Sequence, residues 1–400
     1  MRKVFSWGLL ALASAVPARA DDVTEEAFLA ALDQDHAAVR ALGADLARAE
    51  AARRRVGALA NPRIEVWREQ PDENPTLTNW TIAWTPPLDG RLGLGKSAAD
   101  AGVAAARAEL ALDRAGLRRE VRRVFADWSI GYERCALLAD RLERIGRLAE
   151  QERQRARLGT ESGLAARRLT LAEAMARAAL REAEAERGRA EAGARGWEPG
   201  LHAEAVPVVP ELPAPPETLE AEASPRVRAE EHRLEQAQLE ARLAGRFWGF
   251  PTLQAGVQRL EQGGLVESGP IVAASWSIPL FDRSQGERAE ARARARIAAS
   301  SLEQVRALTR AEMQGGLDAY RSLFAAAREA REAAAESDRV IVAATAAYRA
   351  GESSLTDLLD SLSAAFEIRL RELEVRERAL AAHRDLEATA GRPLSEGGTR

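Results

Sequence analysis

The spacing of proline residues is the feature that most constrains what this 400-residue chain can fold into. No proline occurs between Pro87 and Pro199, or between Pro279 and Pro393. Because a proline inside a helix costs about 3 kcal/mol, both stretches permit helices far longer than the usual ~11 residues. After residue 20, the other prolines cluster at 62–87, at 251–279 and in a linker between the halves. The sequence therefore predicts long helices joined by short non-helical segments.

Composition agrees with long helices and excludes several classes of protein. Charged residues make up 30% of the chain and aromatic residues 5%. This profile excludes a collagen, a disordered chain and a polytopic helical membrane protein. The net charge of −4 gives no sign of nucleic-acid binding. The single cysteine, Cys135, excludes an internal disulfide framework and a cysteine-based zinc site, and we expect a buried, inert thiol there.

Residues 1–20 have the pattern of a secretory signal peptide. Arg2 and Lys3 precede a mostly apolar run, and Ala18-Arg19-Ala20 is typical of a cleavage site. The alternative is a buried N-terminal helix, but Asp21 and Asp22 end the apolar run abruptly. We therefore expect an exported protein.

The two halves of the chain repeat each other. Arg118, Glu120 and Trp128 match Arg310, Glu312 and Tyr320 at an offset of 192 positions. Pro87 and Pro279 keep this offset, as do Gly159 and Gly351, whereas Pro62 and Pro251 differ by 189. A single offset shared by prolines and glycines indicates internal duplication. We expect a first repeat at 21–196, a Pro-rich linker at 197–223, a second repeat at 224–390 and a tail at 391–400.

Each repeat contains two segments with the alternation of β-strands. Residues 23–59 look helical, and strands are predicted at about 61–70 and 77–84. In the second repeat they are predicted at about 251–260 and 270–278. Trp80, Ile82 and Trp84 alternate with smaller or polar residues, which is the period of a strand. The alternative is a soluble sheet with a Trp-rich core, but four short strands are too few for a soluble two-sheet core, so other copies must complete the sheet.

The long helix expected from Ser97 to Arg157 carries an apolar seam. Its members recur at steps of four and three residues, the period of a left-handed supercoil. They are Val121, Phe125, Trp128, Tyr132, Cys135, Ala139, Leu142, Gly146 and Ala149.

Taken together, these features resemble the TolC-like outer-membrane efflux proteins. The resemblance rests on the duplicated helix–hairpin–helix plan, on Asn61-Pro62, and on the Pro-Leu exits at Pro87 to Arg91 and Pro279 to Arg283. The segment from Tyr348 to Asp360 is the most specific part. The short exits containing Asp89-Gly90-Arg91 and Phe281-Asp282-Arg283 are similar to the heavy-metal (CzcC/CusC-like) efflux branch.

The resemblance implies a mainly α fold with a small β part. Four strands from each of three subunits would form a twelve-stranded outer-membrane β-barrel, and the helices would continue as a coiled-coil α-helical barrel into the periplasm. The implied function is a passive exit duct for metal cations or small toxic compounds. Its partners would be a periplasmic adaptor and an inner-membrane pump of the RND type. Lipid-facing barrel residues are expected to be Trp80, Ile82, Trp84, Val272 and Trp276.

Two turns at the ends of the long helices are expected near 157–164 and 349–357. Glycine followed by Ser or Thr is explained by two helix hairpins alone. The resemblance adds that these tips dock the adaptor, through Arg157, Leu158, Gly159, Thr160, Ser162, Arg349, Ala350, Gly351, Ser353 and Leu355. It also implies that Tyr348 is a gate residue and that Asp357 and Asp360 form a constriction, although an Asp on a helix is more often a solvated surface residue. The stretch from Gly163 to Arg168 lacks the family's acidic residue, so the locking contacts are expected to differ.

The residues give no support to an enzyme. His36, His202, His232 and His383 are scattered, and neither a hydrolase triad nor a phosphate-binding loop is present. No cofactor or resident metal is expected. A periplasmic coiled-coil scaffold or adaptor-like protein is the alternative function. It explains the helices and the signal peptide, but not two matched hairpins with tryptophans.

Overall fold

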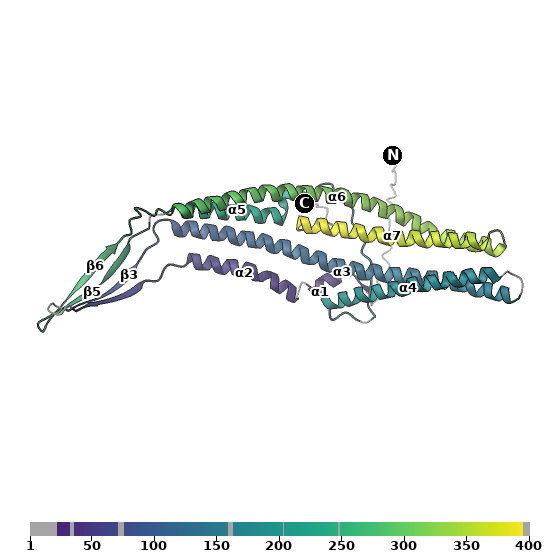
Figure 1. Cartoon of the computed structure of the whole chain (residues 1–400), viewed down its shortest axis with the longest axis horizontal. Coiled ribbons are helices and arrows are strands. Elements are labelled where there is room, and N and C mark those ends of the chain that lie inside the picture. Colours follow the sequence, from purple (N-terminus) through teal and green to yellow (C-terminus); the bar gives the residue numbers. More distant parts are fainter. Residues whose placement is uncertain are drawn as a thin grey trace, which may run out of the picture. The chain divides into compact units, whose positions relative to one another are not determined.

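The computed structural model describes residues 22–32, 36–70, 76–158, 163–202, 204–246 and 249–394 (Figure 1). These residues form two compact units. The described residues of the tip unit fall within Met1–Gln34, Glu120–Pro213 and Ser322–Ala381. Those of the strand unit fall within Asp35–Arg119, Ala214–Arg321 and Ala382–Arg400. Each unit contains segments of both repeats, so the compact units cut across the duplication. The predicted signal peptide lies outside the described residues.

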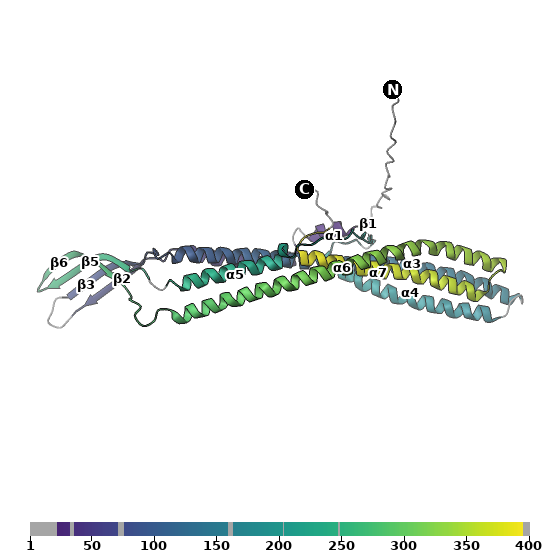
Figure 2. The ribbon, with the colours of Figure 1, turned by 90° about the horizontal axis from the view of Figure 1, so that it is seen from above.

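The strand unit contains one antiparallel four-stranded sheet in the order β2-β3-β5-β6 (Figure 2). Its strands are β2 (Arg63–Glu69), β3 (Thr76–Trp84), β5 (Thr252–Gln262) and β6 (Leu265–Ser275). Each repeat supplies one hairpin, and β3 pairs with β5 where the two hairpins meet. The predicted four strands are therefore present and form a single sheet.

In the second repeat, the second strand begins and ends earlier than predicted. Strand β6 begins at Leu265, five positions before the predicted start, and it ends before Trp276. Its early residues pair with β5 as far as Gln262↔Leu265. Gly263 and Gly264, with φ of 52° and 87°, make the tight turn that lets pairing start immediately. Backbone pairing thus extends the strand through Glu267, Ser268 and Gly269, where the apolar alternation is interrupted.

The described residues of the strand unit also include the short 3-10 helix η1 (Ala221–Ala223), the end of α7 (Leu355–Ala390) and four longer helical segments. The four longer segments are α2 (Ala37–Gly57), α5 (Pro225–Ala244), and the first parts of α3 (Arg91–Arg157) and α6 (Gln285–Ala350). The two long helices have 67 and 66 residues, which confirms the prediction from the proline-free stretches. No helix in the described ranges combines the length and the apolar character needed to cross a membrane.

The tip unit is built from two helix hairpins. In the first, α3 is followed by α4 (Gly163–Trp197); in the second, α6 is followed by α7 (Leu355–Ala390). All four helices contribute to one hydrophobic cluster, with Ile145 from α3, Leu169 from α4, Ile341 from α6 and Phe366 from α7. This shared core holds the two hairpins together through apolar burial.

The predicted seam of α3 is partly reproduced. Val121, Phe125, Trp128, Cys135 and Ala149 are buried, but Ala139 is exposed. Leu138, Ile145 and Leu148 are buried as well. One buried stripe follows the predicted spacing at first and then moves to neighbouring positions, as expected when a straight helix drifts from a 3.5-residue repeat.

The N-terminal segment differs from the predicted single helix over 23–59. It forms the two-residue strand β1 (Asp22–Val23), α1 (Glu25–Leu32) and then α2. Strand β1 pairs in parallel with β4 (Val206–Pro207), which lies within the Pro-rich linker. A partner almost two hundred positions away determines this strand, so no local pattern indicates it.

Candidate functional site

One face of the sheet is apolar and exposed. Trp80, Ile82 and Trp84 share this face because side chains alternate along β3, and they are 43%, 56% and 38% exposed. Residues directly opposite each other in antiparallel strands share a face, so the register extends it across the sheet. The remaining large apolar members of this face are Ile64, Val66, Leu253, Val257, Val266 and Val272. At the end of the sheet away from the helices the same face carries Arg68 and the ion pair of Arg259 with Glu261.

The opposite face of the sheet carries more polar side chains, although Leu77, Leu260 and Ile271 also lie on it. It carries Asn79, Thr81, Gln254 and Gln258, and the Gln254 amide donates to Glu65 Oε2 at 3.1 Å. Trp67 lies opposite Asn79 and therefore on this polar face, unlike Trp80 and Trp84. Apolar side chains thus predominate on one face in the half of the sheet nearer the helices, and hydrogen-bonding groups lie behind them on the other face.

Glycine is required at one point in the middle of the sheet. A Cβ atom on Gly256 would lie 1.9 Å from the backbone oxygen of Trp80 and 2.7 Å from the Cα atom of Thr81. Both distances are far below van der Waals contact. The two hairpins therefore approach each other this closely only because position 256 has no side chain.

The two repeats place a tryptophan at the helix-side end of the sheet in the same way. The indole of Trp84 donates to the backbone oxygen of Ala60 at 3.1 Å. The indole of Trp276 donates to the backbone oxygen of Gly249 at 3.0 Å. These residues are related by the same offsets that define the duplication. Each tryptophan ties the end of one hairpin to the connection that enters it.

The second tip is a well-defined helix end. Gly351 has a φ of 75°, its N–H donates to Tyr348 O at 3.1 Å, and Glu352 N–H donates to Ala347 O at 2.9 Å. This pair of bonds satisfies the last carbonyls of α6 in a Schellman motif. A glycine is needed because other residues rarely adopt this left-handed conformation.

Asp357 caps the helix that follows. Its Oδ2 accepts from the Ser354 backbone N–H at 3.0 Å and from the Ser354 hydroxyl at 2.7 Å. The Asp357 N–H donates back to Ser354 Oγ at 3.2 Å, which completes a reciprocal capping box. The two hydrogen bonds from Ser354, its hydroxyl first, lower the pKa of the Asp357 carboxyl. Asp360 is exposed one turn later and has no hydrogen bond or ion pair within the described part of the chain.

The other predicted residues of the second tip divide into packed and exposed groups. Tyr348 and Leu355 are partly buried against the hydrophobic cluster of the tip unit. Arg349 and Ala350 are exposed, whereas Ser353 is half-buried. Tyr348 therefore has a packing role within one subunit, whatever else it does.

The first tip is described only at its two sides. Helix α3 ends at Arg157, and Leu158, the next residue, is 78% exposed. Leu164, at the start of α4, is also exposed. The predicted tip residues Gly159, Thr160 and Ser162 lie outside the described residues.

A side-chain hydrogen bond links the beginnings of α4 and α7. Arg168 Nη1 donates to Thr356 Oγ1 at 3.1 Å. The sequence shows only that residues 163–168 lack an acidic residue, and no local pattern indicates this contact. The guanidinium and hydroxyl connect the two hairpins beside the predicted constriction residues.

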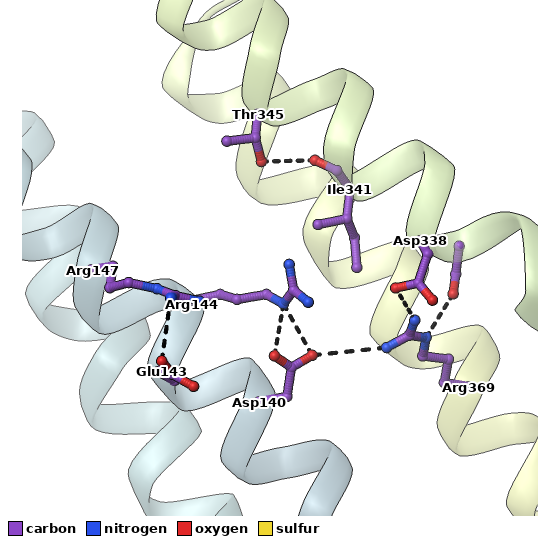
Figure 3. A network of polar contacts seen from close by, with 9 residues as sticks. Asp140, Glu143, Arg144, Arg147, Asp338, Ile341, Thr345 and Arg369 are labelled. Atoms are coloured by element: carbon purple, nitrogen blue, oxygen red, sulfur yellow. Dashed lines mark hydrogen bonds and ion pairs between the residues drawn. The ribbon is translucent and has the colours of Figure 1, made fainter.

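A larger polar network crosses the tip unit further along the helices (Figure 3). Arg369 on α7 donates to Ser337 Oγ at 2.7 Å, forms an ion pair with Asp338 on α6 and lies 3.8 Å from Asp140 on α3. Asp140 also accepts from Arg144 Nε at 2.8 Å and 3.0 Å. The Arg369 side chain is only 19% exposed, so these partners balance a largely buried charge. The local sequence gives no signal for this network.

Within the described ranges, no group of three or more His, Cys, Asp or Glu side chains is placed to hold a metal ion. The predicted constriction residues Asp357 and Asp360 are on one helix and one turn apart. Any larger carboxylate set at this position would require more than one copy of the chain.

Comparison with known proteins agrees with this architecture. Residues 218–392 match the sequence profile of the outer membrane efflux protein family. The structure is similar to that of CusC, with a TM-score of 0.75, 15% identity and 92% of each chain covered. It is also similar to the open state of the MtrE outer membrane channel of Neisseria gonorrhoeae, with a TM-score of 0.70, 18% identity and coverage of 94% and 90%.

A third similar structure is the outer membrane protein VceC of Vibrio cholerae, with a TM-score of 0.67, 16% identity and coverage of 92% and 96%. No protein in a curated set matches the sequence. The predicted resemblance to the TolC-like outer-membrane efflux proteins is confirmed: residues 218–392 match that family, and the chain has the fold of its solved channels.

Proposed function

We propose that this protein is the outer-membrane channel subunit of a tripartite efflux system, and that it works as a homotrimer. The observation that carries the proposal is the sheet with one exposed apolar face and one polar face. Such a sheet suits a wall between lipid and water, because each face meets a solvent of its own polarity. The protein would sit in the outer membrane and extend into the periplasm.

The open edges of the sheet support a trimer. Among the described residues, strand β2 pairs only with β3 and strand β6 only with β5, so both edges of the sheet expose unpaired backbone groups. Exposed edges favour pairing with another chain, and closure into a barrel removes them. Three copies joined from β2 to β6 would form a closed wall of twelve strands.

The two tips are proposed to dock the periplasmic adaptor. Leu158 and Leu164 expose apolar surface at the first tip, and Arg349 and Ala350 are exposed at the second. Small exposed apolar groups beside charged ones suit a protein contact surface. An inner-membrane pump, of the RND type by resemblance, would supply the energy, and the channel itself would be passive.

The pore-lining role of Tyr348, Asp357 and Asp360 remains part of the proposal. A ring of carboxylates around a narrow opening favours cations. This charge, together with the similarity of the two exits to the heavy-metal branch, supports metal cations as substrates; small toxic compounds are the second class. A coiled-coil scaffold would not need a sheet with an exposed apolar face.

Substitution of Ile82 tests the proposal directly. Ile82→Arg places a charge on the apolar face, and it should destabilise membrane insertion by roughly 2–4 kcal/mol if the residue lies near the midplane. Gln258→Arg, on the polar face, is the matched control and should assemble normally. The measurement is the amount of trimer recovered from outer-membrane fractions. If both variants instead appear with the soluble periplasmic proteins, as does the wild type, the protein is a scaffold.

A further inference from the structure

A cavity of about 730 Å³ lies within the strand unit, beside the helix-side end of the sheet. It is formed where the ends of α2 and α5 meet the beginnings of α3 and α6. Its apolar lining includes Val56, Leu59, Leu92 and Leu243. This volume falls in the ~300–1,000 Å³ range of pockets that hold small ligands.

The surroundings of the cavity have the character of a membrane interface. Ala60, which lines the cavity, accepts the indole hydrogen bond of Trp84. The connections from the sheet to α3 and α6 carry an apolar collar, made of the exposed side chains Leu88, Ile278, Leu280 and Phe281, which are 58–92% exposed. Tryptophans at strand ends are typical of headgroup depth, and exposed apolar connections beside them suit contact with lipid.

The cavity contains one cation and one anion that have no partner within the described ranges. Most of its charged groups are engaged: Arg91 pairs with Asp89 at 3.1 Å, Arg294 pairs with Glu290, and Glu240 accepts from Gln236 at 2.8 Å. The guanidinium of Arg246 and the carboxylate of Glu287 have no hydrogen bond or ion pair there. Two opposite charges in one cavity, neither of them in an ion pair, are complementary to the two charges of a zwitterion.

We propose that this cavity binds the headgroup of a zwitterionic phospholipid with a primary ammonium group, from the periplasmic leaflet. The phosphate would accept from Arg246, whose planar fork matches phosphate geometry. The ammonium would donate to Glu287, and the first acyl carbons would contact Leu59, Leu92 and Leu243. The inference rests on the proposed function, because it requires the sheet to lie in a membrane.

The test measures lipid retention on the purified, delipidated trimer by native mass spectrometry. The probes are phosphatidylethanolamine, phosphatidylcholine, phosphatidylglycerol and diacylglycerol, each added alone at the same ratio. Phosphatidylethanolamine should be retained at up to three molecules per trimer and at least tenfold more strongly than diacylglycerol. Phosphatidylcholine should be retained less, because its ammonium has no N–H to donate. Inorganic phosphate should not displace the bound lipid.

Matched variants test the separate roles of Arg246 and Glu287 in lipid binding. Arg246→Gln should reduce retention of every phosphate-bearing lipid at least tenfold, whereas Arg246→Lys should keep most of it. Glu287→Gln should remove only the preference for phosphatidylethanolamine over phosphatidylglycerol. Arg242→Gln on α5 and Glu303→Gln on α6 lie outside the cavity and should behave as wild type.

Two results would overturn the inference. One is equal retention of diacylglycerol and phosphatidylethanolamine by the wild type; the other is unchanged retention by Arg246→Gln. A conducting trimer that retains no lipid would show that the channel function stands and that the cavity is not a lipid site. A protein that forms no trimer in membranes would instead contradict the proposed function.

Discussion

At the scale of single residues, Asp357 combines a local role with a proposed functional one. Its carboxylate caps α7 through Ser354, and this bonding lowers its pKa. A group with a lowered pKa in the folded state stabilises that state above its unfolded-state pKa. The contribution is lost as the pH falls through the folded value. The stabilising effect of Asp357 is therefore expected at neutral pH and not in acid.

Asp357→Asn should accordingly lower the thermal midpoint at pH 7, and the difference from wild type should shrink as the pH falls below about 4, the region where an ordinary Asp protonates. The measurement is thermal unfolding followed by circular dichroism from pH 7 to pH 3. Asp360→Asn is the control, since Asp360 makes no capping bond, and it should change the midpoint little. A difference that stays the same at every pH would show that the charge of Asp357 contributes nothing to the cap.

The thiol of Cys135 is expected to be unreactive in the folded protein. It is buried with Leu138 and Ala183, and this burial raises the pKa of its thiol. Because the thiolate is the reactive form, both access and ionisation are reduced. Maleimide labelling of the wild type should be slow in buffer and rapid in denaturant. Leu158→Cys in a Cys135→Ser background is the control, since position 158 is 78% exposed and should label at once. Rapid labelling of native Cys135 would contradict the packing of α3 against α4.

At the scale of elements, the meeting of the two hairpins depends on Gly256. A Cβ atom there would collide with the backbone of β3, which cannot move without breaking the pairing of β3 with β5. Gly256→Ala should therefore prevent the two hairpins from forming one sheet, and little assembled trimer should be recovered. Gly269→Ala is the matched control on the same face, since no atom lies within 4 Å of its added Cβ. The comparison uses trimer yield in outer-membrane extracts, and equal yields of the two variants would refute this account.

The sequence predicted the elements better than it predicted their contacts. The alternation through Trp80, Ile82 and Trp84 locates β3 to within one residue, because a half-buried strand shows its period in its own side chains. The start of β6 was missed, because backbone pairing with β5 continues where the side-chain pattern stops. Strand β1 was missed because its partner, β4, lies in the linker.

The same distinction applies to the candidate site. The glycine turn at position 351 was predicted, since a glycine followed by a capping serine is a local signal. Arg168–Thr356 and Arg369–Asp338 join helices that are far apart in the sequence. Alanine-rich and arginine-rich helices offer many equivalent partners for such contacts. Only the packing of the four helices selects among them.

At the scale of the whole molecule, the duplication gives the two β-hairpins equivalent places in the sheet. Each repeat contributes two neighbouring strands to one sheet, and each ends its hairpin with a tryptophan bonded to the incoming connection. Trp128 and Tyr320, equivalent in the repeat, are both buried, one in each compact unit. A trimer of such chains would surround its axis with six similar hairpins, so that any pore-facing residue is repeated in a ring.

Asp360 is the more available of the two carboxylates proposed to line the channel opening. Asp357 already accepts two hydrogen bonds from Ser354, whereas Asp360 is exposed and uncommitted in the described structure. In the proposed trimer three Asp360 carboxylates would face one opening. Their negative charge would attract cations, and their mutual repulsion would disfavour closure. Asp360→Asn should therefore reduce cation selectivity and block by multivalent cations more than Asp357→Asn does, with trimer formation intact. Reversal potentials and conductance in planar bilayers measure both effects, and Glu367→Gln, further along α7, is the control. Unchanged selectivity in the Asp357→Asn, Asp360→Asn double variant would place both carboxylates outside the pore, even though the fold of the channel would stand.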